Sequence, residues 1–145
     1  MIVERLAPTT SARLTVLAED VSVRAAADFF SDIQLGLIVV CGESGQATGV
    51  VSKSDLVRHL ARSGSAAAPI GEVMTRSIVY CSPGQELNDV WQSMRLRRLQ
   101  NMPVLENGRR PLGVLDIRDA LQAILCEEQD QERLLVNYIA GVGYR

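Results

Sequence analysis

The feature that most constrains this chain is an internal repeat at a spacing of 64 residues. The segment 49–56, GVVSKSDL, resembles the segment 113–120, GVLDIRDA, and the same spacing aligns 38–40 with 102–104 without gaps. It also aligns two apolar quartets, each at positions i, i+3, i+4 and i+7, which mark one face of a helix. They are Val23, Ala26, Ala27 and Phe30, and Leu87, Val90, Trp91 and Met94. Similarity at a fixed spacing indicates a duplicated structural unit. We therefore predict two copies of one fold.

Each copy is predicted to run in the order β-α-β-β-α, which is an α/β unit. The predicted elements of the first copy are 14–17, 22–32, 37–41, 47–51 and 53–62, and those of the second are 78–81, 86–98, 102–105, 111–115 and 117–128. The Asn107-Gly108 pair is a strong hairpin signal between the last two strands. A single unit of about 60 residues would leave one face of its sheet exposed, so we expect the two copies to pack together.

The boundaries follow from the repeat and from one stretch of small residues. Residues 64–69 form a predicted linker between a first repeat, 1–63, and a second repeat, 70–128. Each repeat begins with a lead-in, because 2–6 resembles 70–74. Residues 129–145 are predicted to be a C-terminal helix and tail. The helix, over 127–139, carries an apolar stripe and ends at the glycines of 141–143. The stripe consists of Leu134, Leu135, Tyr138 and Ile139.

Composition excludes several classes of protein. The net charge of −2 argues against a nucleic-acid partner. The longest apolar run, 35–41, has seven residues, whereas a membrane span takes about 20. The start of the chain does not resemble a secretory signal, so we expect a cytoplasmic protein. Three cysteines without paired spacing predict neither disulfides nor a metal site. His59 is the only histidine, and the sequence contains no catalytic motif that we could identify, so we do not expect an enzyme or a catalytic cofactor.

The segment 49–55 has the parts of a nucleotide site. Ser52 occupies the N-cap position of a predicted helix, whose free N–H groups and dipole attract phosphate. Asp55, one turn later, could accept hydrogen bonds from both hydroxyls of a ribose. Gly49 would let a ligand approach the strand. The alternative is a capping box, in which Ser52 and Asp55 serve only the helix start.

The duplicated frame resembles the cystathionine-β-synthase (CBS) domain family over about residues 1–128. The resemblance rests on 38–40 and 102–104, each followed by the Gly-containing motif, and on the lead-in with Val73-Met74-Thr75-Arg76. It implies tandem CBS repeats related by pseudo-two-fold symmetry, often called a Bateman module. Such modules bind adenosine ligands such as AMP, ADP, ATP or S-adenosylmethionine in two clefts, commonly pair into homodimers, and regulate rather than catalyse. The last residues, 138–145, resemble the ending of small stand-alone bacterial members.

Carried over by position, the resemblance predicts the contacts of each cleft. In the first cleft, Asp55 would hold the ribose, Ser52 would contact phosphate, and Gly49 and Val50 would line the sugar. In the second, Asp119 and Gly113 match the ribose carboxylate and the strand glycine. The base would contact apolar residues near the second strand of each repeat, for which the candidates are Ile38, Val39, Val40, Met102, Pro103 and Val104. Further candidates for phosphate contacts are Lys53, Arg76, Arg95, Arg97 and Arg98; solvent-exposed positions are the alternative.

Asp116 departs from the family pattern, which has Thr or Ser at this position. A carboxylate about 4 Å from a phosphate costs about 4 kcal/mol of repulsion at an effective dielectric near 20, unless a cation intervenes. We therefore expect asymmetry, with the better nucleotide site at Ser52 and Asp55. The second cleft would be empty, take an uncharged adenosine group or need a metal bridge. Alternatively, Asp116 is simply an N-cap.

The sequence thus predicts a regulatory module that senses adenosine nucleotides and passes a conformational change to an unidentified protein partner. The alternative is a ligand-free CBS pair that serves dimerisation or docks to another protein through its C-terminal helix.

Overall fold

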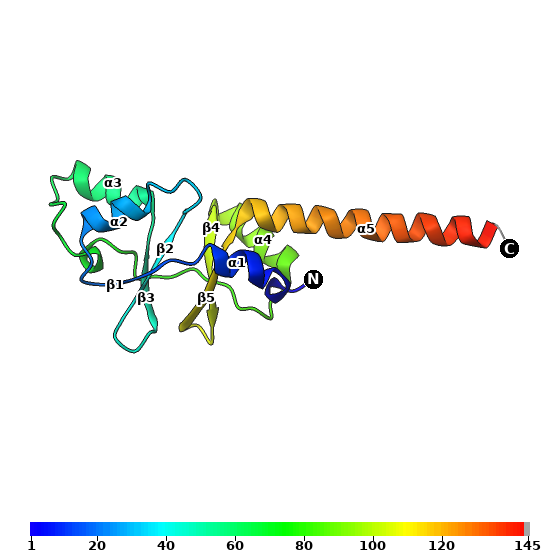
Figure 1. The fold of residues 1–145 in the computed structure, drawn as a ribbon, viewed down its shortest axis with the longest axis horizontal. Helices are drawn as coiled ribbons and strands as arrows, with labels where there is room; N and C mark the ends of the chain where they lie inside the picture. The colour runs from blue at the N-terminus through cyan, green and yellow to red at the C-terminus, as the bar shows by residue number, and fades with distance from the viewer. Residues whose placement is uncertain (144–145) are drawn as a thin grey trace.

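The two predicted copies form two lobes, and a long helix projects away from them (Figure 1). The structure is a computed structural model that describes residues 1–143; Tyr144 and Arg145 of the predicted tail lie outside it. The first half contains η1 (Val3–Leu6), α1 (Ala7–Ala12), β1 (Val16–Ala18), α2 (Val23–Phe29), β2 (Ile38–Cys41), β3 (Ala47–Val51) and α3 (Lys53–Ala61). The second half contains η2 (Ile70–Glu72), α4 (Leu87–Arg97), β4 (Asn101–Glu106), β5 (Arg110–Asp116) and α5 (Ile117–Gly143).

The strand registers repeat at the predicted spacing of 64 residues. In the first sheet, β1 runs parallel to β2, and β2 pairs antiparallel with β3. In the second, β4 pairs antiparallel with β5. Val40 pairs with Gly49 and Val104 pairs with Gly113, and each pairing is followed by a register shift at the next residue of the strand. Matching irregularities at matching positions confirm that the chain is a tandem duplication with an α/β fold.

The predicted lead strand over 78–81 is wrong, because only Cys81 forms a bridge, to Val104. Proline explains the loss. In the first repeat, the N–H of Val39 donates to the carbonyl of Thr15 at 3.0 Å. The residue 64 positions later is Pro103, which has no N–H, so the equivalent bond cannot form.

Helix α2 ends three residues earlier than predicted. Side chains compete for the backbone groups that a continued helix would use. The Ser31 hydroxyl donates to the carbonyl of Asp28 at 2.6 Å, and the Asp32 carboxylate accepts from the N–H of Gln34 at 2.9 Å. These turns lead the chain directly into the loop before β2.

The closing helix of the second repeat was predicted as two helices, over 117–128 and 127–139, but α5 is continuous. In the first repeat, α3 ends where Ser63 takes a left-handed φ of 63° and the N–H of Gly64 bonds to the carbonyl of His59. The corresponding residues of the second repeat are Glu127 and Glu128, which favour a helix. Nothing stops α5 there.

Three apolar clusters hold the molecule together. One fills the first repeat around Ile38 and Leu56, and another fills the second around Met102 and Leu115. The third consists of Leu37, Val39, Cys41 and Val114 and contains residues of both repeats. The two copies therefore share a core, as the argument from exposed sheet faces predicts.

The lead-ins are exchanged between the repeats. Val3 at the start of the chain belongs to the core of the second repeat, where its N–H bonds to the carbonyl of Gln85 at 2.9 Å. Ile70, which precedes the second repeat, belongs to the core of the first, and its N–H bonds to the carbonyl of Val21 at 2.7 Å. Each repeat is thus completed by a segment that lies, in sequence, before the other.

We predict that Gly113→Ala destabilises the protein more than Gly49→Ala. A Cβ at Gly113 would lie 2.7 Å from the backbone carbonyl carbon of Thr10, whereas at Gly49 the nearest atom, at 2.6 Å, is the flexible Met74 sulfur. Overpacking against backbone should lower the free energy of unfolding by about 1–3 kcal/mol, and Gly49→Ala should cost about 1 kcal/mol. Denaturant titrations of the two variants would check this order, and equal losses would contradict it.

Candidate functional site

A pocket of about 590 Å³ is lined by residues of both repeats. It is lined by residues 34–37 and by their counterparts at the spacing of 64, residues 98–101. Ser52 lines it from the first repeat, and Asp116, its counterpart, lines it from the second. Each repeat contributes the segment that leads into the first strand of its hairpin, β2 or β4, and the start of its closing helix. The fold therefore brings two of the predicted site residues into one shared pocket.

Ser52 reaches the pocket because it caps α3. Its hydroxyl accepts from the N–H of Asp55 at 3.2 Å, and the Asp55 carboxylate accepts from the N–H of Ser52 at 3.0 Å. This capping box is the alternative that the sequence left open, and it places the N-terminal end of α3, with Lys53 and Ser54, at the pocket wall. Free N–H groups and the dipole at such an end favour an anion.

Asp55 lies on the other side of the capping box. It lines a separate hollow of about 240 Å³ and is 8% exposed. Arg58 of its own helix approaches the carboxylate at 3.2 Å, and the Thr75 hydroxyl lies 3.5 Å from each carboxylate oxygen. The Thr75 bonds are at the long limit, so Asp55 keeps acceptor capacity.

Asp116 is buried and its negative charge is balanced within the chain. It accepts from the N–H of Arg118 at 2.8 Å, which is the N-cap role that the sequence left open, and from two guanidinium nitrogens of Arg118 at 3.0 and 2.8 Å. Burial alone would raise the pKa of Asp116, but these bonds and the charges of Arg118 and Arg13 hold that pKa below its ordinary value. The positive charges of Arg118 and Arg13 therefore offset the negative charge by which Asp116 would repel a phosphate.

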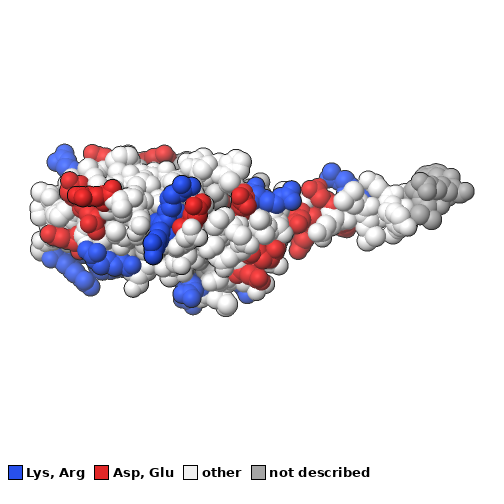
Figure 2. Space-filling model, turned by 90° about the horizontal axis from the view of Figure 1, so that it is seen from below, with Lys and Arg blue, Asp and Glu red and all other residues white. Residues whose placement is uncertain are grey.

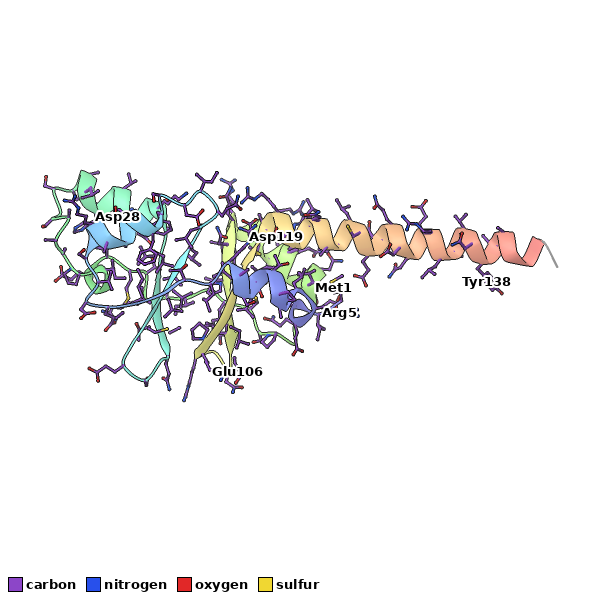
Figure 3. The ribbon with its side chains drawn as sticks, in the orientation of Figure 1. Met1, Arg5, Asp28, Glu106, Asp119 and Tyr138 are labelled. Carbon is purple, nitrogen blue, oxygen red and sulfur yellow. The ribbon has the colours of Figure 1, made fainter. Side chains whose placement is uncertain are left out.

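Asp119, the second predicted ribose carboxylate, faces an arginine. It lies at the base of α5 beside α1, far from Tyr138 along the same helix (Figure 3). Nε of Arg13 donates to one of its oxygens at 2.6 Å, and Nη2 donates to the other at 3.3 Å. Both oxygens of this carboxylate are therefore engaged.

The predicted base-contacting residues lie in the apolar cores. Ile38, Val39 and Val40 are fully buried, and Met102 and Val104 are nearly so. Gly49 and Gly113 are buried as well, the first against Met74 and Thr75 and the second against Thr10. Pro103 accepts a bond from the N–H of Cys81, and Val50 pairs with Thr75. Of these residues, none lines the pocket between the repeats in the described part of the chain. Their predicted ligand contacts stay predictions.

Three cationic side chains line the pocket, from Lys53, Arg98 and Arg118. Arg98 follows α4 as its C-cap in a left-handed conformation, with φ 56°. Two other arginine candidates point elsewhere: Arg76 lies 3.9 Å from Glu19, and Arg95 stacks over Trp91 at 5.6 Å. Arg97 lines a hollow beside α4. Lys53 and Arg98 together form the cationic lining that an anionic ligand requires.

Sequence reasoning found Arg98 but missed Arg13, Arg118 and the loop residues 34–37 and 99–101. The signal that could have found the loops was the repeat itself, because matching segments that precede matching strands must lie across the symmetry axis. The contact of Arg13 had no such signal, since its partners Gln34 and Asp119 are 21 and 106 residues away in sequence.

Comparison with known proteins places the chain in a family. The CBS domain model matches residues 3–62 and 70–126. Among curated proteins, the chain is 26% identical over 121 residues to the 5′-AMP-activated protein kinase subunit gamma-3 of Bos taurus; the match covers 77% of this chain and 24% of that subunit. The chain thus spans about a quarter of this relative.

Solved structures agree with the fold. A CBS-domain-containing protein of Agrobacterium tumefaciens is 27% identical, with a TM-score of 0.73, and the match covers 85% of this chain and 98% of that one. A CBS domain protein of Pyrobaculum aerophilum, solved in complex with AMP, is 22% identical, with a TM-score of 0.71 and coverage of 82% and 89%. Within residues 1–143, no helix has the length and apolarity needed to cross a membrane.

Proposed function

Since this chain belongs to the CBS domain family, we propose that it is a regulatory module that binds an adenosine nucleotide between its repeats and passes a conformational change to a partner. The relative from Pyrobaculum aerophilum was solved in complex with AMP, and the other relative is a subunit of a kinase that is named for its activation by 5′-AMP. An adenosine ligand for this chain is the natural extension of both.

The observation that carries the proposal is the cationic pocket between the repeats. Its volume of about 590 Å³ falls within the range of small-molecule sites. Lys53, Arg98 and the N-terminal end of α3 all meet there, and Ser52 adds a hydroxyl. These groups are suited to the phosphates of a nucleotide, because Arg and helix ends both bind phosphate oxygens.

The ribose of that nucleotide is assigned to Asp55. Its carboxylate is buried, and its oxygens accept from the N–H of Ser52 at 3.0 Å and from the half-exposed Arg58 at 3.2 Å. The hydroxyl of Thr75 makes only long contacts of 3.5 Å with the two oxygens. Two ribose hydroxyls are better donors than one distant threonine, so a ligand reaching across the cap would replace the Thr75 contacts. The first cleft is therefore proposed to be the nucleotide site.

Helix α5 is the proposed route from the site to a partner. It begins immediately after Asp116, so its first turn forms part of the pocket. At about 1.5 Å per residue, its 27 residues extend about 40 Å. A small rotation at the pocket would move the far end by a larger distance. A ligand produces such a shift only through different affinities for the two orientations.

The second candidate function is ligand-free docking or dimerisation, and the end of α5 favours it. Leu134, Leu135, Tyr138 and Ile139 are all at least 60% exposed, and this stretch of the helix carries no charged side chains (Figure 2). An exposed apolar stretch of this kind is typical of an interaction surface. A homodimer and a protein effector are both compatible with it.

A ligand titration separates the two candidates. We predict that AMP, ADP, ATP or S-adenosylmethionine raises the melting temperature, with a stabilisation of about 2.7 kcal/mol at a hundredfold excess over Kd. Differential scanning fluorimetry and calorimetry would measure it, with guanosine monophosphate as the control for unspecific phosphate binding. If no adenosine compound shifts the melting temperature at millimolar concentration, the docking function is correct.

A further inference from the structure

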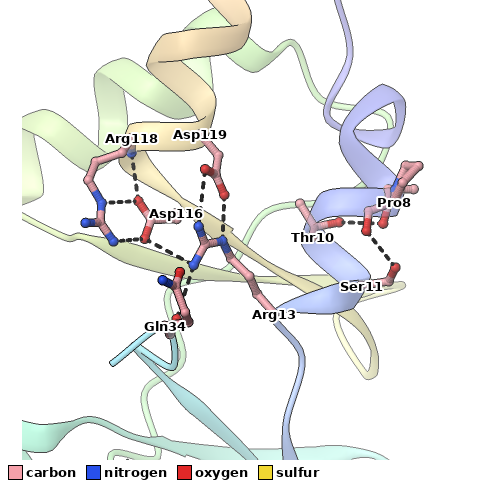
Figure 4. Close-up of polar contacts among 9 residues, drawn as sticks. Pro8, Thr10, Ser11, Arg13, Gln34, Asp116, Arg118 and Asp119 are labelled. Carbon is pink, nitrogen blue, oxygen red and sulfur yellow. Dashed lines mark hydrogen bonds and ion pairs between the residues drawn. The ribbon is translucent and has the colours of Figure 1, made fainter. Parts of the chain in front are cut away.

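The guanidinium of Arg13 lies against Asp119, the predicted ribose carboxylate of the second cleft, and joins three parts of the molecule (Figure 4). Arg13 follows α1, in the segment that leads into the first repeat. It bonds to both oxygens of Asp119 at the base of α5, and its Nη1 donates to the carbonyl of Gln34, before β2, at 3.1 Å. The same Nη1 lies 3.8 Å from Asp116. Only 20% of the Arg13 side chain is exposed.

The two bonds from Arg13 to Asp119 resemble the bonds that a ribose would make to the same carboxylate. A ribose presents two adjacent hydroxyls, and a carboxylate receives one on each oxygen. Arg13 presents two N–H groups of a planar fork to the same two oxygens, as charge-assisted bonds. A ribose can reach Asp119 only after both bonds break.

The first cleft has no such side chain at the matching position. The spacing of 64 residues places Ser77 where Arg13 stands. The neighbouring Arg76 is directed toward Glu19 and the carbonyl of Gly71. From the lead-in, Asp55 receives only the two long contacts of Thr75. The Asp55 carboxylate does contact an arginine of its own helix, but Arg58 reaches only one of its oxygens, at 3.2 Å, and is 56% exposed. The lead-in of the first cleft therefore lacks a buried arginine that engages both oxygens of the carboxylate, as Arg13 does at Asp119.

We infer that Arg13 is an internal occupant of the second cleft, which restricts the module to one adenosine nucleotide per chain. This inference rests on the proposed function, since it concerns the second of the two clefts. It assigns the asymmetry to Arg13, which blocks Asp119, rather than to repulsion by Asp116, whose charge is already balanced by Arg118. Replacement of Arg13 by a small side chain opens a second site.

Calorimetric titration with AMP tests the inference through stoichiometry. The wild-type chain should bind one AMP, and Arg13→Ser, which copies the residue of the first cleft, should bind two. The double variant Arg13→Ser/Asp119→Ala should return to one. Arg110→Ser is the matched control: it removes an arginine from another carboxylate pair, with Glu106, and should leave one AMP per chain.

A second variant, Arg13→Gln, keeps the test possible if Arg13→Ser does not fold. Arg13→Gln keeps much of the aliphatic stem and loses the charge, so it should fold if Arg13→Ser does not, and it should also bind two AMP. If both folded variants bind the same number of AMP molecules as the wild type, the inference is wrong, whatever that number is.

If the wild type binds none and Arg13→Ser binds one, Arg13 is an occupant but the proposed site at Asp55 fails. A wild type that binds two AMP molecules overturns the inference and leaves the proposed function intact.

Discussion

Asp55→Ala should weaken AMP binding by about 30-fold, whereas Asp119→Ala should change the Kd by less than about threefold. The first substitution removes a charged acceptor of two ribose hydrogen bonds, and a loss of about 2 kcal/mol corresponds to that factor. The second removes a carboxylate that Arg13 already occupies. Isothermal titration calorimetry on the two variants and the wild type would measure both values.

The capping role of Asp55 requires a control in this experiment. Asp55→Ala also removes the bond to the N–H of Ser52, which costs about 1 kcal/mol of stability. Asp55→Asn keeps one oxygen for that bond and loses the charge, so its affinity should fall while its melting temperature changes less. Equal losses of affinity in the Asp55 and Asp119 variants would exclude the proposed asymmetry between the clefts.

Ile70→Ala should lower the free energy of unfolding by about 2–5 kcal/mol, the usual cost of a large cavity in a core. Ile70 is fully buried in the core of the first repeat, together with Ile38 and Met74. Denaturant unfolding would measure the loss. Ile33→Ala is the control, because Ile33 is 84% exposed and its truncation should cost less than about 0.5 kcal/mol.

Hydrogen exchange would show which repeat the Ile70 cavity weakens. By sequence, Ile70 precedes the second repeat, but its packing predicts that the amides of β2 and β3 lose protection before those of β4 and β5. Val3→Ala should give the opposite order, since Val3 packs in the second repeat. The same order in both variants would show that the exchanged lead-ins do not stabilise the repeats separately.

The repeat pattern was sufficient to predict the strands of both hairpins and the helices that cover them. Local rules explain why: apolar periodicity, hairpin residues and the Ser52 cap are properties of a few neighbouring residues. The errors arose where the two copies differ in sequence. Pro103 removed a strand bond, and the residues after 126 continue a helix that, in the first copy, ends before the left-handed residue Ser63.

The candidate site shows the same difference between what local sequence predicts and what tertiary packing decides. The segment 49–55 was found from its residues, and the structure placed Ser52 and Asp116 at one pocket, as counterparts in a duplication should be. The same structure put Asp55 on the far side of its own cap and the apolar candidates in the cores. Those placements depend on which face of a strand or helix turns toward the other repeat.

The sequence alone therefore determined the duplicated α/β unit and the helix start at Ser52, because both are fixed by interactions within a short stretch of chain. Tertiary structure decided which lead-in completes which core, and it brought Arg13 to Asp119. These contacts join residues far apart in the chain, and their formation depends on the packing of the two repeats around a shared core. No pattern among neighbouring residues predicts which of these distant residues come into contact.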